Sequence, residues 1–86
     1  MIFDYDRQKS NTNKEKHGID FNQAQELWQD PDCIVIPART MDESRYLLIG
    51  KLNQKIWSAI FTVRNKKIRI ISVRRSRKNE EEIYKS

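Results

Sequence analysis

The residues best suited to chemistry lie in one segment of the chain, from Arg64 to Lys78. This segment contains eight of the seventeen lysines and arginines and no acidic residue, so the net charge of +5 originates there. Guanidinium groups stay charged at physiological pH and bind phosphates through paired hydrogen bonds. A fixed group of arginines can also stabilise the negative charge that develops during phosphoryl transfer, without a metal ion. The segment therefore predicts a site for a phosphate-bearing polyanion.

Alternation along the strand expected at Ile68 to Val73 divides these cations between two faces. Arg69 shares a face with Val73, whereas Arg74 falls on the opposite face unless a bulge intervenes. Two interpretations of the segment remain open. In the first, the arginines hold a phosphate during catalysis. In the second, they form a solvated basic surface that only binds backbone phosphates or an acidic partner.

Two other side chains could take part in proton transfer. Tyr84 lies on a helix expected at the C-terminus, where its phenol could donate a proton or its ring could stack on a base. It could equally anchor that helix together with Ile83. His17 is the only imidazole in the chain, but its place beside Gly18 is typical of a residue that caps a helix C-terminus.

No pattern in the sequence indicates a metal ion or a cofactor. The acids that could bind a metal lack the ligand spacing of known sites; they are Asp30, Asp32, Asp42 and Glu43. The two glycines, Gly18 and Gly50, are too few for a nucleotide-binding glycine loop. Cys33 is the only cysteine, so it forms no intramolecular disulfide, and its apolar neighbours indicate a buried thiol rather than a nucleophile.

The elements that must position these side chains follow from periodicity and turn residues. The predicted order is a short strand, two helices, four strands in an antiparallel meander and a terminal helix. The strands are expected at 3–5, 33–36, 45–52, 56–63 and 68–73, with a loop at 37–42. The helices are expected at 6–17, from Asp20 until Asp30-Pro31, and after Ser76 as an N-cap. This order predicts an α+β fold whose helices leave one sheet face or its rim open.

Helix and turn boundaries have local signals. Asp20 and Gln23 form a capping-box pattern at the start of the second helix. The segment from Asp6 to His17 contains no apolar residue, so periodicity alone cannot assign it. Hairpin turns are expected at Asn53-Gln54 and Asn65-Lys66, because asparagine tolerates the positive φ of a tight hairpin.

With 86 residues, the chain is expected to form a single domain, residues 1–86. Its first residues lack the basic and apolar regions of a signal peptide, and no apolar run approaches the roughly 18 residues of a membrane span. We therefore expect a cytoplasmic protein that does not bind membranes. A hydrophobic fraction of 37% against a charged fraction of 34% indicates a thin core, which a protein partner would complete.

Several stretches together resemble the BrnT family of type II toxin–antitoxin toxins, which are small ribonucleases with a RelE-like fold. The resemblance spans nearly the whole chain, and the spacing of Lys16-His17-Gly18 from the arginine segment makes it fairly specific. The residues that carry it are Phe3-Asp4-Tyr5-Asp6, Lys9, Asn13, Lys16-His17-Gly18-Ile19-Asp20-Phe21, Asp30-Pro31, Glu43-Ser44-Arg45-Tyr46, Ile49-Gly50, Arg64, Ile68 to Arg75, and Tyr84. The chain departs from the family pattern at Asn65, where glycine is frequent, at Val73, where alanine is usual, and in its short end after Tyr84.

The resemblance implies that residues 6–17 form a helix and that the sheet is the RelE-like antiparallel one. It also implies metal-independent cleavage of messenger RNA, either free or on the ribosome, by attack of the ribose 2′-oxygen on the adjacent phosphate. That reaction needs a base, cations around the phosphorane and an acid for the leaving 5′-oxygen. The implied catalytic residues are Arg64, Arg74 and Arg75 around the phosphate, Tyr84 as acid or stacking ring, and Glu43 as base, with Lys51 as another candidate base. The implied RNA-binding residues are Lys51, Arg69, Arg77 and Lys78.

Toxins of this family are neutralised by a cognate BrnA-type antitoxin, a small DNA-binding protein. The resemblance therefore implies that protein partner, and contact with DNA only through it. The leading hypothesis is an endoribonuclease toxin that inhibits translation and needs no cofactor. Two alternatives stay open, namely a non-catalytic nucleic-acid-binding module and a partner-dependent interaction protein.

Overall fold

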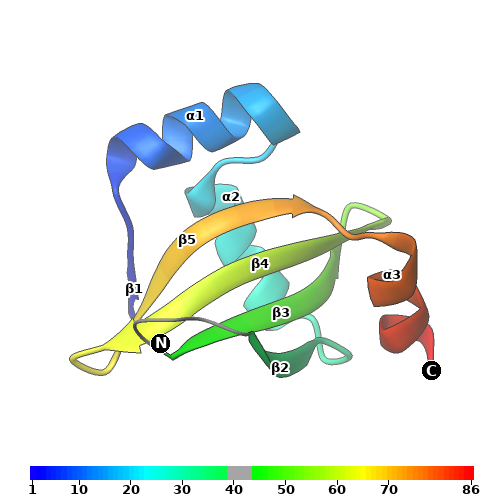
Figure 1. The fold of residues 1–86 in the computed structure, drawn as a ribbon. Coiled ribbons are helices and arrows are strands. Elements are labelled where there is room, and N and C mark those ends of the chain that lie inside the picture. Colours follow the sequence, from blue (N-terminus) through cyan, green and yellow to red (C-terminus); the bar gives the residue numbers. More distant parts are fainter. Residues whose placement is uncertain (39–43) are drawn as a thin grey trace.

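Four antiparallel strands form the body of a five-stranded sheet, and a short fifth strand extends one edge (Figure 1). The computed structural model describes residues 1–38 and 44–86. The strands are β1 (Phe3–Asp4), β2 (Ile34–Ala38), β3 (Arg45–Leu52), β4 (Lys55–Arg64) and β5 (Lys67–Arg75), in the spatial order β1-β5-β4-β3-β2. The α+β class is confirmed. The sheet is mixed rather than antiparallel throughout, because β1 runs parallel to β5, and the RelE-like assignment stays a prediction.

The N-terminal helices cover one face of the sheet, and the C-terminal helix lies at one end of it (Figure 1). The helices are α1 (Arg7–His17), α2 (Phe21–Ala24), which continues into the 3₁₀ helix η1 (Gln25–Gln29), and α3 (Lys78–Lys85). The main core lies under α2 and η1, where Phe21 and Leu27 pack with Leu48 and Val73. This core positions the helices above the sheet.

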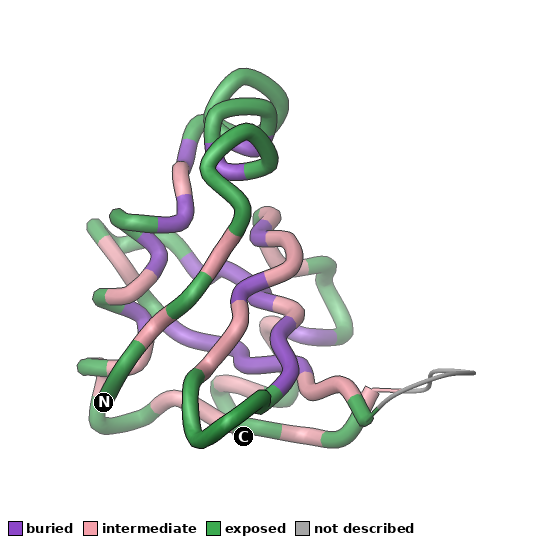
Figure 2. The backbone as a smooth tube through the Cα atoms, turned by 90° about the vertical axis from the view of Figure 1, so that its left-hand side faces the viewer, coloured by how far each residue is buried: buried purple, intermediate pink, exposed green. Residues whose placement is uncertain are grey.

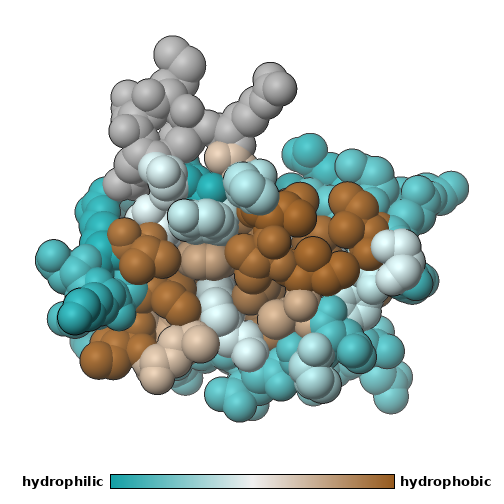
Figure 3. Space-filling model, turned by 90° about the horizontal axis from the view of Figure 1, so that it is seen from below, coloured by the Kyte–Doolittle hydropathy of each residue, from teal (hydrophilic) through white to brown (hydrophobic). Residues whose placement is uncertain are grey.

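The opposite face of the sheet is apolar across its middle. A cross-strand row runs from Ile36 through Leu47 to Ile60, because these residues are register partners on β2, β3 and β4. Figure 3 shows apolar side chains gathered on this face. Tyr84 of α3 packs against the cluster that Leu47 forms with its neighbours, whereas Ile83 is 38% exposed. The C-terminal helix therefore covers only part of this apolar surface.

Both predicted hairpin turns are confirmed by their backbone angles. Asn53 and Gln54 have φ of 51° and 66°, and Asn65 and Lys66 have φ of 51° and 65°. Two successive residues with positive φ are the mark of the turn that matches the twist of a two-residue hairpin. These turns fix the register of β3 with β4 and of β4 with β5.

The helix α1 is held to the sheet by polar contacts. It has no apolar residue, and Figure 2 shows it exposed along most of its length. Its buried Asn13 donates from Nδ2 to the carbonyl oxygens of Ile19 (2.8 Å) and Val73 (2.9 Å), and its Oδ1 accepts from the Val73 amide (3.1 Å). Asn13 thereby provides hydrogen-bond partners for the backbone N–H and C=O of Val73. These groups lie on β5 beyond the two residues that pair with β1, where a neighbouring strand would otherwise bond them.

A β-bulge in β5 overturns the predicted alternation. Ile60 pairs with Ser72 and Phe61 pairs with Ile70, so Ile71 has no register partner. The faces therefore exchange at Ile71, and Arg69 and Arg74 lie on the same face of the sheet, opposite Thr62 and Ser58 of β4. The prediction that Arg69 and Arg74 point to opposite sides is wrong for this reason.

Other boundaries differ slightly from those predicted. The first strand ends at Asp4, and β2 extends to Ala38, so Pro37 belongs to a strand and the rest of the predicted loop lies outside the described residues. The N-cap of α3 is Arg77, because the Ser76 hydroxyl bonds to that of Ser58 (2.7 Å) instead. Within the described ranges, no helix is long and apolar enough to cross a membrane.

We predict that Asn13→Ala lowers the free energy of unfolding by about 2 to 3 kcal/mol, because it leaves buried backbone groups of Val73 and Ile19 without partners. Urea unfolding followed by circular dichroism measures this change. Asn11→Ala, at an exposed position of the same helix, is the matched control and should change stability by less than about 1 kcal/mol. Equal effects of the two substitutions would contradict the role assigned to Asn13.

Candidate active site at the α3 end of the sheet

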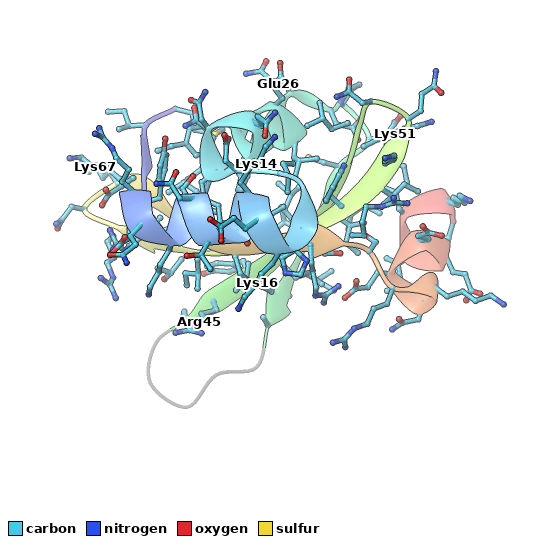
Figure 4. All side chains as sticks on the ribbon, turned by 90° about the horizontal axis from the view of Figure 1, so that it is seen from above. Lys14, Lys16, Glu26, Arg45, Lys51 and Lys67 are labelled. Carbon is cyan, nitrogen blue, oxygen red and sulfur yellow. The ribbon has the colours of Figure 1, made fainter. Side chains whose placement is uncertain are left out.

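One end of the sheet brings together most of the predicted site residues. At this end, which we call the α3 end, β3 finishes at Leu52, β4 begins at Lys55 and β5 finishes at Arg75, and α3 follows (Figure 1). Figure 4 shows Lys51 near the β3–β4 hairpin, with α3 next to it. The predicted residues at this end are Lys51, Arg74, Arg75, Arg77, Lys78 and Tyr84.

A buried carboxylate occupies the centre of the α3 end. Glu80, which is 7% exposed, accepts hydrogen bonds from two nitrogens of Arg74, Nη1 at 2.7 Å and Nη2 at 2.9 Å. Its Oε1 also accepts from the Ser58 hydroxyl and from the Arg77 amide, both at 2.9 Å. The first turn of α3 is thereby bonded to β4 and β5 together.

This network keeps both partners charged. The hydrogen bonds from Arg74 lower the pKa of Glu80 to about 2, with help from the Arg77 amide and the Ser58 hydroxyl, against the opposing effect of burial. The same hydrogen bonds raise the pKa of Arg74. Arg74 Nη1 additionally donates to the Arg75 carbonyl at 3.3 Å. The guanidinium of Arg74 therefore joins α3 to the sheet and offers few free donors to a phosphate.

A second carboxylate positions Tyr84. Asp30 Oδ2 accepts from the Tyr84 hydroxyl at 2.5 Å and from the Lys51 amide at 2.8 Å, and Oδ1 accepts from the Asp32 amide at 2.9 Å. Tyr84 and Asp30 are both half-buried, whereas the Lys51 side chain is exposed. The last turn of α3, the end of η1 and the end of β3 thus meet at one carboxylate.

The Asp30–Tyr84 contact shifts the pKa values of both groups. The hydrogen bond to Asp30, reinforced by burial, raises the pKa of Tyr84 to about 12. Burial by itself would raise the pKa of Asp30, but the hydrogen bonds from Tyr84, Asp32 and Lys51 outweigh it and lower that pKa below its usual value. At neutral pH the pair is a phenol whose proton is directed at an ionised carboxylate.

Arg75 lies on the other face of the sheet from Arg74. Its guanidinium carbon is 5.5 Å from the centroid of the Trp57 ring, a cation–π geometry, and Trp57 is its register partner on β4. Arg75 is exposed and has no carboxylate partner among the residues that the structure describes. Contact with the ring restricts the guanidinium while its hydrogen-bond donors stay available.

Two predicted arginines lie away from this end. Arg64 pairs in register with Lys67 at the opposite hairpin, six residues along β4 from Ser58, which corresponds to about 20 Å of strand. The structure therefore does not bring Arg64 together with Arg74 and Arg75. Arg69 forms an ion pair with Asp4 of β1 at 3.0 Å, so it secures the edge strand.

The remaining predicted residues are placed as follows. Arg77 and Lys78 are exposed at the start of α3. Glu43, the predicted base, lies outside the described residues. His17 is exposed at the end of α1 and lines a groove with Ser72, away from Tyr84. In the described part of the chain, no three His, Cys, Asp or Glu side chains are grouped as a metal ion would require.

Sequence patterns identify neither Asp30 nor Glu80 as a hydrogen-bond acceptor of the site. Asp30 enters the sequence analysis as a candidate metal ligand, as the end of the second helix and as part of the family resemblance. Glu80 lies six residues after Arg74, across the change from strand to helix, so no periodicity links the two side chains. The only available signal was the position of Glu80, three residues after the N-cap, where a carboxylate bonds the capping amide.

A family model described as "Ribonuclease toxin, BrnT, of type II toxin-antitoxin system" matches residues 5–80 of the 86. The chain belongs to the BrnT family. The resemblance found in the sequence is thereby confirmed, together with its general meaning, a ribonuclease toxin of a type II toxin–antitoxin system with an antitoxin as partner. A comparison with curated proteins gave no match. The BrnT match includes Arg74, Arg75 and Glu80, and it ends before Tyr84.

The buried Glu80 predicts a pH-dependent contribution to stability. Its pKa in the folded protein, about 2, lies below the usual 4.5, so its contribution is complete above pH 4.5 and is lost as the pH falls toward 2. We expect Glu80→Gln to destabilise the protein by about 3 kcal/mol at pH 7, because Arg74 loses its charged partner. At pH 3 the difference in free energy of unfolding between wild type and Glu80→Gln should be about 2 kcal/mol smaller than at pH 7.

Urea unfolding at the two pH values measures this difference. Glu82→Gln, on the exposed side of the same helix, removes the same charge and should leave stability within about 0.5 kcal/mol of wild type at pH 7. A destabilisation by Glu80→Gln that is the same at pH 7 and pH 3 would rule out the ion pair as its cause.

Proposed function

We propose that this BrnT-family chain is an endoribonuclease that cuts messenger RNA without a metal ion, at the α3 end of the sheet. The ribose 2′-oxygen attacks the adjacent phosphorus, a bond forms between them, and the bond from phosphorus to the 5′-oxygen breaks. The products are a 2′,3′-cyclic phosphate and a 5′-hydroxyl. The observation that carries the proposal is the hydrogen bond from Tyr84 to the ionised Asp30, within a family of ribonuclease toxins.

In this mechanism Tyr84 and Asp30 act together as the base. The Tyr84 oxygen accepts the proton of the 2′-hydroxyl while the phenolic proton passes to Asp30, 2.5 Å away. A carboxylate with a lowered pKa stays available for this transfer over the whole physiological range. The phenolic proton already points at Asp30, so relay to Asp30 fits the geometry better than donation to the leaving 5′-oxygen.

The exposed cations of the α3 end supply charge to the phosphate. Lys51, whose backbone amide bonds the same carboxylate as Tyr84, stabilises the phosphorane and donates a proton to the leaving 5′-oxygen. Arg75, Arg77 and Lys78 bind phosphates of the flanking nucleotides, and Arg64 binds the RNA backbone at the far hairpin. Arg74 acts as a positioning residue through Glu80.

The proposed cleavage of messenger RNA determines the cellular role of the protein. Cleavage of messenger RNA in the cytoplasm inhibits translation, and a BrnA-type antitoxin neutralises the toxin by covering this surface. The apolar side chains gathered beside α3, where Ile36 and Ile60 are only half-buried, support the presence of a protein partner, because an apolar surface patch is typical of a binding face.

The relay is tested by Tyr84→Phe, which removes the hydroxyl and keeps the ring that packs on the apolar cluster. We expect at least about a 10²-fold loss of the RNA cleavage rate, measured with purified protein and messenger RNA in the presence of a chelator. Expression of the wild type should arrest growth, and expression of the variant should not.

Tyr46→Phe is the matched control, because Tyr46 stacks on Phe61 in the main core, away from Asp30. It should cleave RNA at a rate within about threefold of wild type. Full activity of Tyr84→Phe would eliminate the relay. A wild-type protein that binds RNA without cutting it would favour the non-catalytic binding module instead.

A further inference from the structure

A cleft on the helix-covered face of the α3 end has no role in the mechanism above. It lies between the start of α2 and the β3–β4 hairpin, with a volume of about 280 Å³. Such a volume lies near the lower limit of sites for small molecules, about 300 Å³. The cleft is lined by Gly18, Ile19, Gln23, Glu26, Leu52, Asn53, Lys55 and Trp57.

One residue that lines the cleft is aromatic, namely Trp57. Trp57 is 8% exposed, and its indole Nε1 has no hydrogen-bond partner within the described part of the chain. A buried donor without an acceptor costs about 1 to 3 kcal/mol. Arg75 lies over the ring of this lining residue, with its guanidinium carbon 5.5 Å from the ring centroid. Guanidinium planes and aromatic rings are the groups on which RNA bases stack.

The walls of the cleft offer donors and one carboxylate. The Gln23 oxygen is already used, because it accepts from Lys14 Nζ (2.9 Å) and from the Asp20 amide (3.0 Å), so the Gln23 side-chain nitrogen is left to donate. Lys55 adds a cation. Glu26, on η1, is exposed, has no ion-pair partner among the described residues, and lines the cleft.

We propose that this cleft binds a guanine base of the RNA substrate, an inference that rests on the proposed ribonuclease function. Guanine presents two N–H donors, N1 and N2, which the Glu26 carboxylate can accept together, and acceptors O6 and N7 for the donors of Gln23 and Lys55. Adenine presents an acceptor at N1, which a carboxylate repels. Arg75, which lies over the Trp57 ring, holds the phosphate of the same nucleotide.

The test measures binding apart from cleavage. Single-stranded DNA hexamers lack the 2′-hydroxyl and cannot be cut by the proposed mechanism, so their dissociation constants report binding without cleavage, and the differences between hexamers report the choice of base. Three fluorescein-labelled hexamers contain one guanine, one adenine or one hypoxanthine among thymines, and binding is followed by anisotropy. We expect the guanine hexamer to bind about tenfold more tightly than the adenine hexamer. The hypoxanthine hexamer, which lacks the N2 amino group, should fall between them.

Glu26→Ala should abolish the preference for guanine. Glu15→Ala removes the same charge from an exposed position on α1, outside the cleft, and should retain the preference. Equal affinity of wild type for the guanine and adenine hexamers, or an unchanged preference in Glu26→Ala, would overturn the inference. If the protein cleaves RNA but shows no preference for guanine, the guanine site is refuted and the ribonuclease proposal stands. If it prefers guanine but does not cleave RNA, the ribonuclease proposal is refuted and the guanine site stands.

Discussion

The buried carboxylate of Glu80 holds the last helix against the sheet. Four donors, two from Arg74 and one each from Ser58 and Arg77, converge on it from β5, β4 and the start of α3. If this carboxylate were removed, the charge of Arg74 would stay half-buried without a partner, a situation that costs several kcal/mol in proteins. The Tyr84–Asp30 pair of the proposed active site depends on this junction, because Tyr84 reaches Asp30 only when α3 lies across the end of β3.

Much of the fold was predictable because local signals decide it. Asparagines at both hairpin tips, the capping box at Asp20 and the glycine after α1 each determine backbone geometry within a few residues. The bulge at Ile71 was not predictable, since no glycine or proline marks it. Its cause is tertiary: Ile70 and Val73 both enter the main core, and one extra residue between them is the only way to place both on the same face.

The candidate site was predictable in its residue types but not in its geometry. Charge clustering identified Arg74 and Arg75, yet it could not reveal that one is neutralised by Glu80 and the other lies on Trp57, because both partners come from different elements. Arg64 belongs to the same basic segment and lies at the other end of the sheet, since a hairpin places the start of one strand beside the end of the previous one. Proximity in sequence was therefore a poor guide to proximity in the site.

The central claim is that Arg74 serves cleavage by docking α3 rather than by touching the phosphate. RNA cleavage by the charge-exchanged double variant, Arg74→Glu with Glu80→Arg, tests it most directly. We predict that each single substitution abolishes cleavage and that the double variant recovers at least about tenfold over either one, because the ion pair is rebuilt in reverse. A double variant that has the stability of wild type in urea unfolding and still fails to cut RNA would contradict the claim. It would indicate that Arg74 contacts the reacting phosphate.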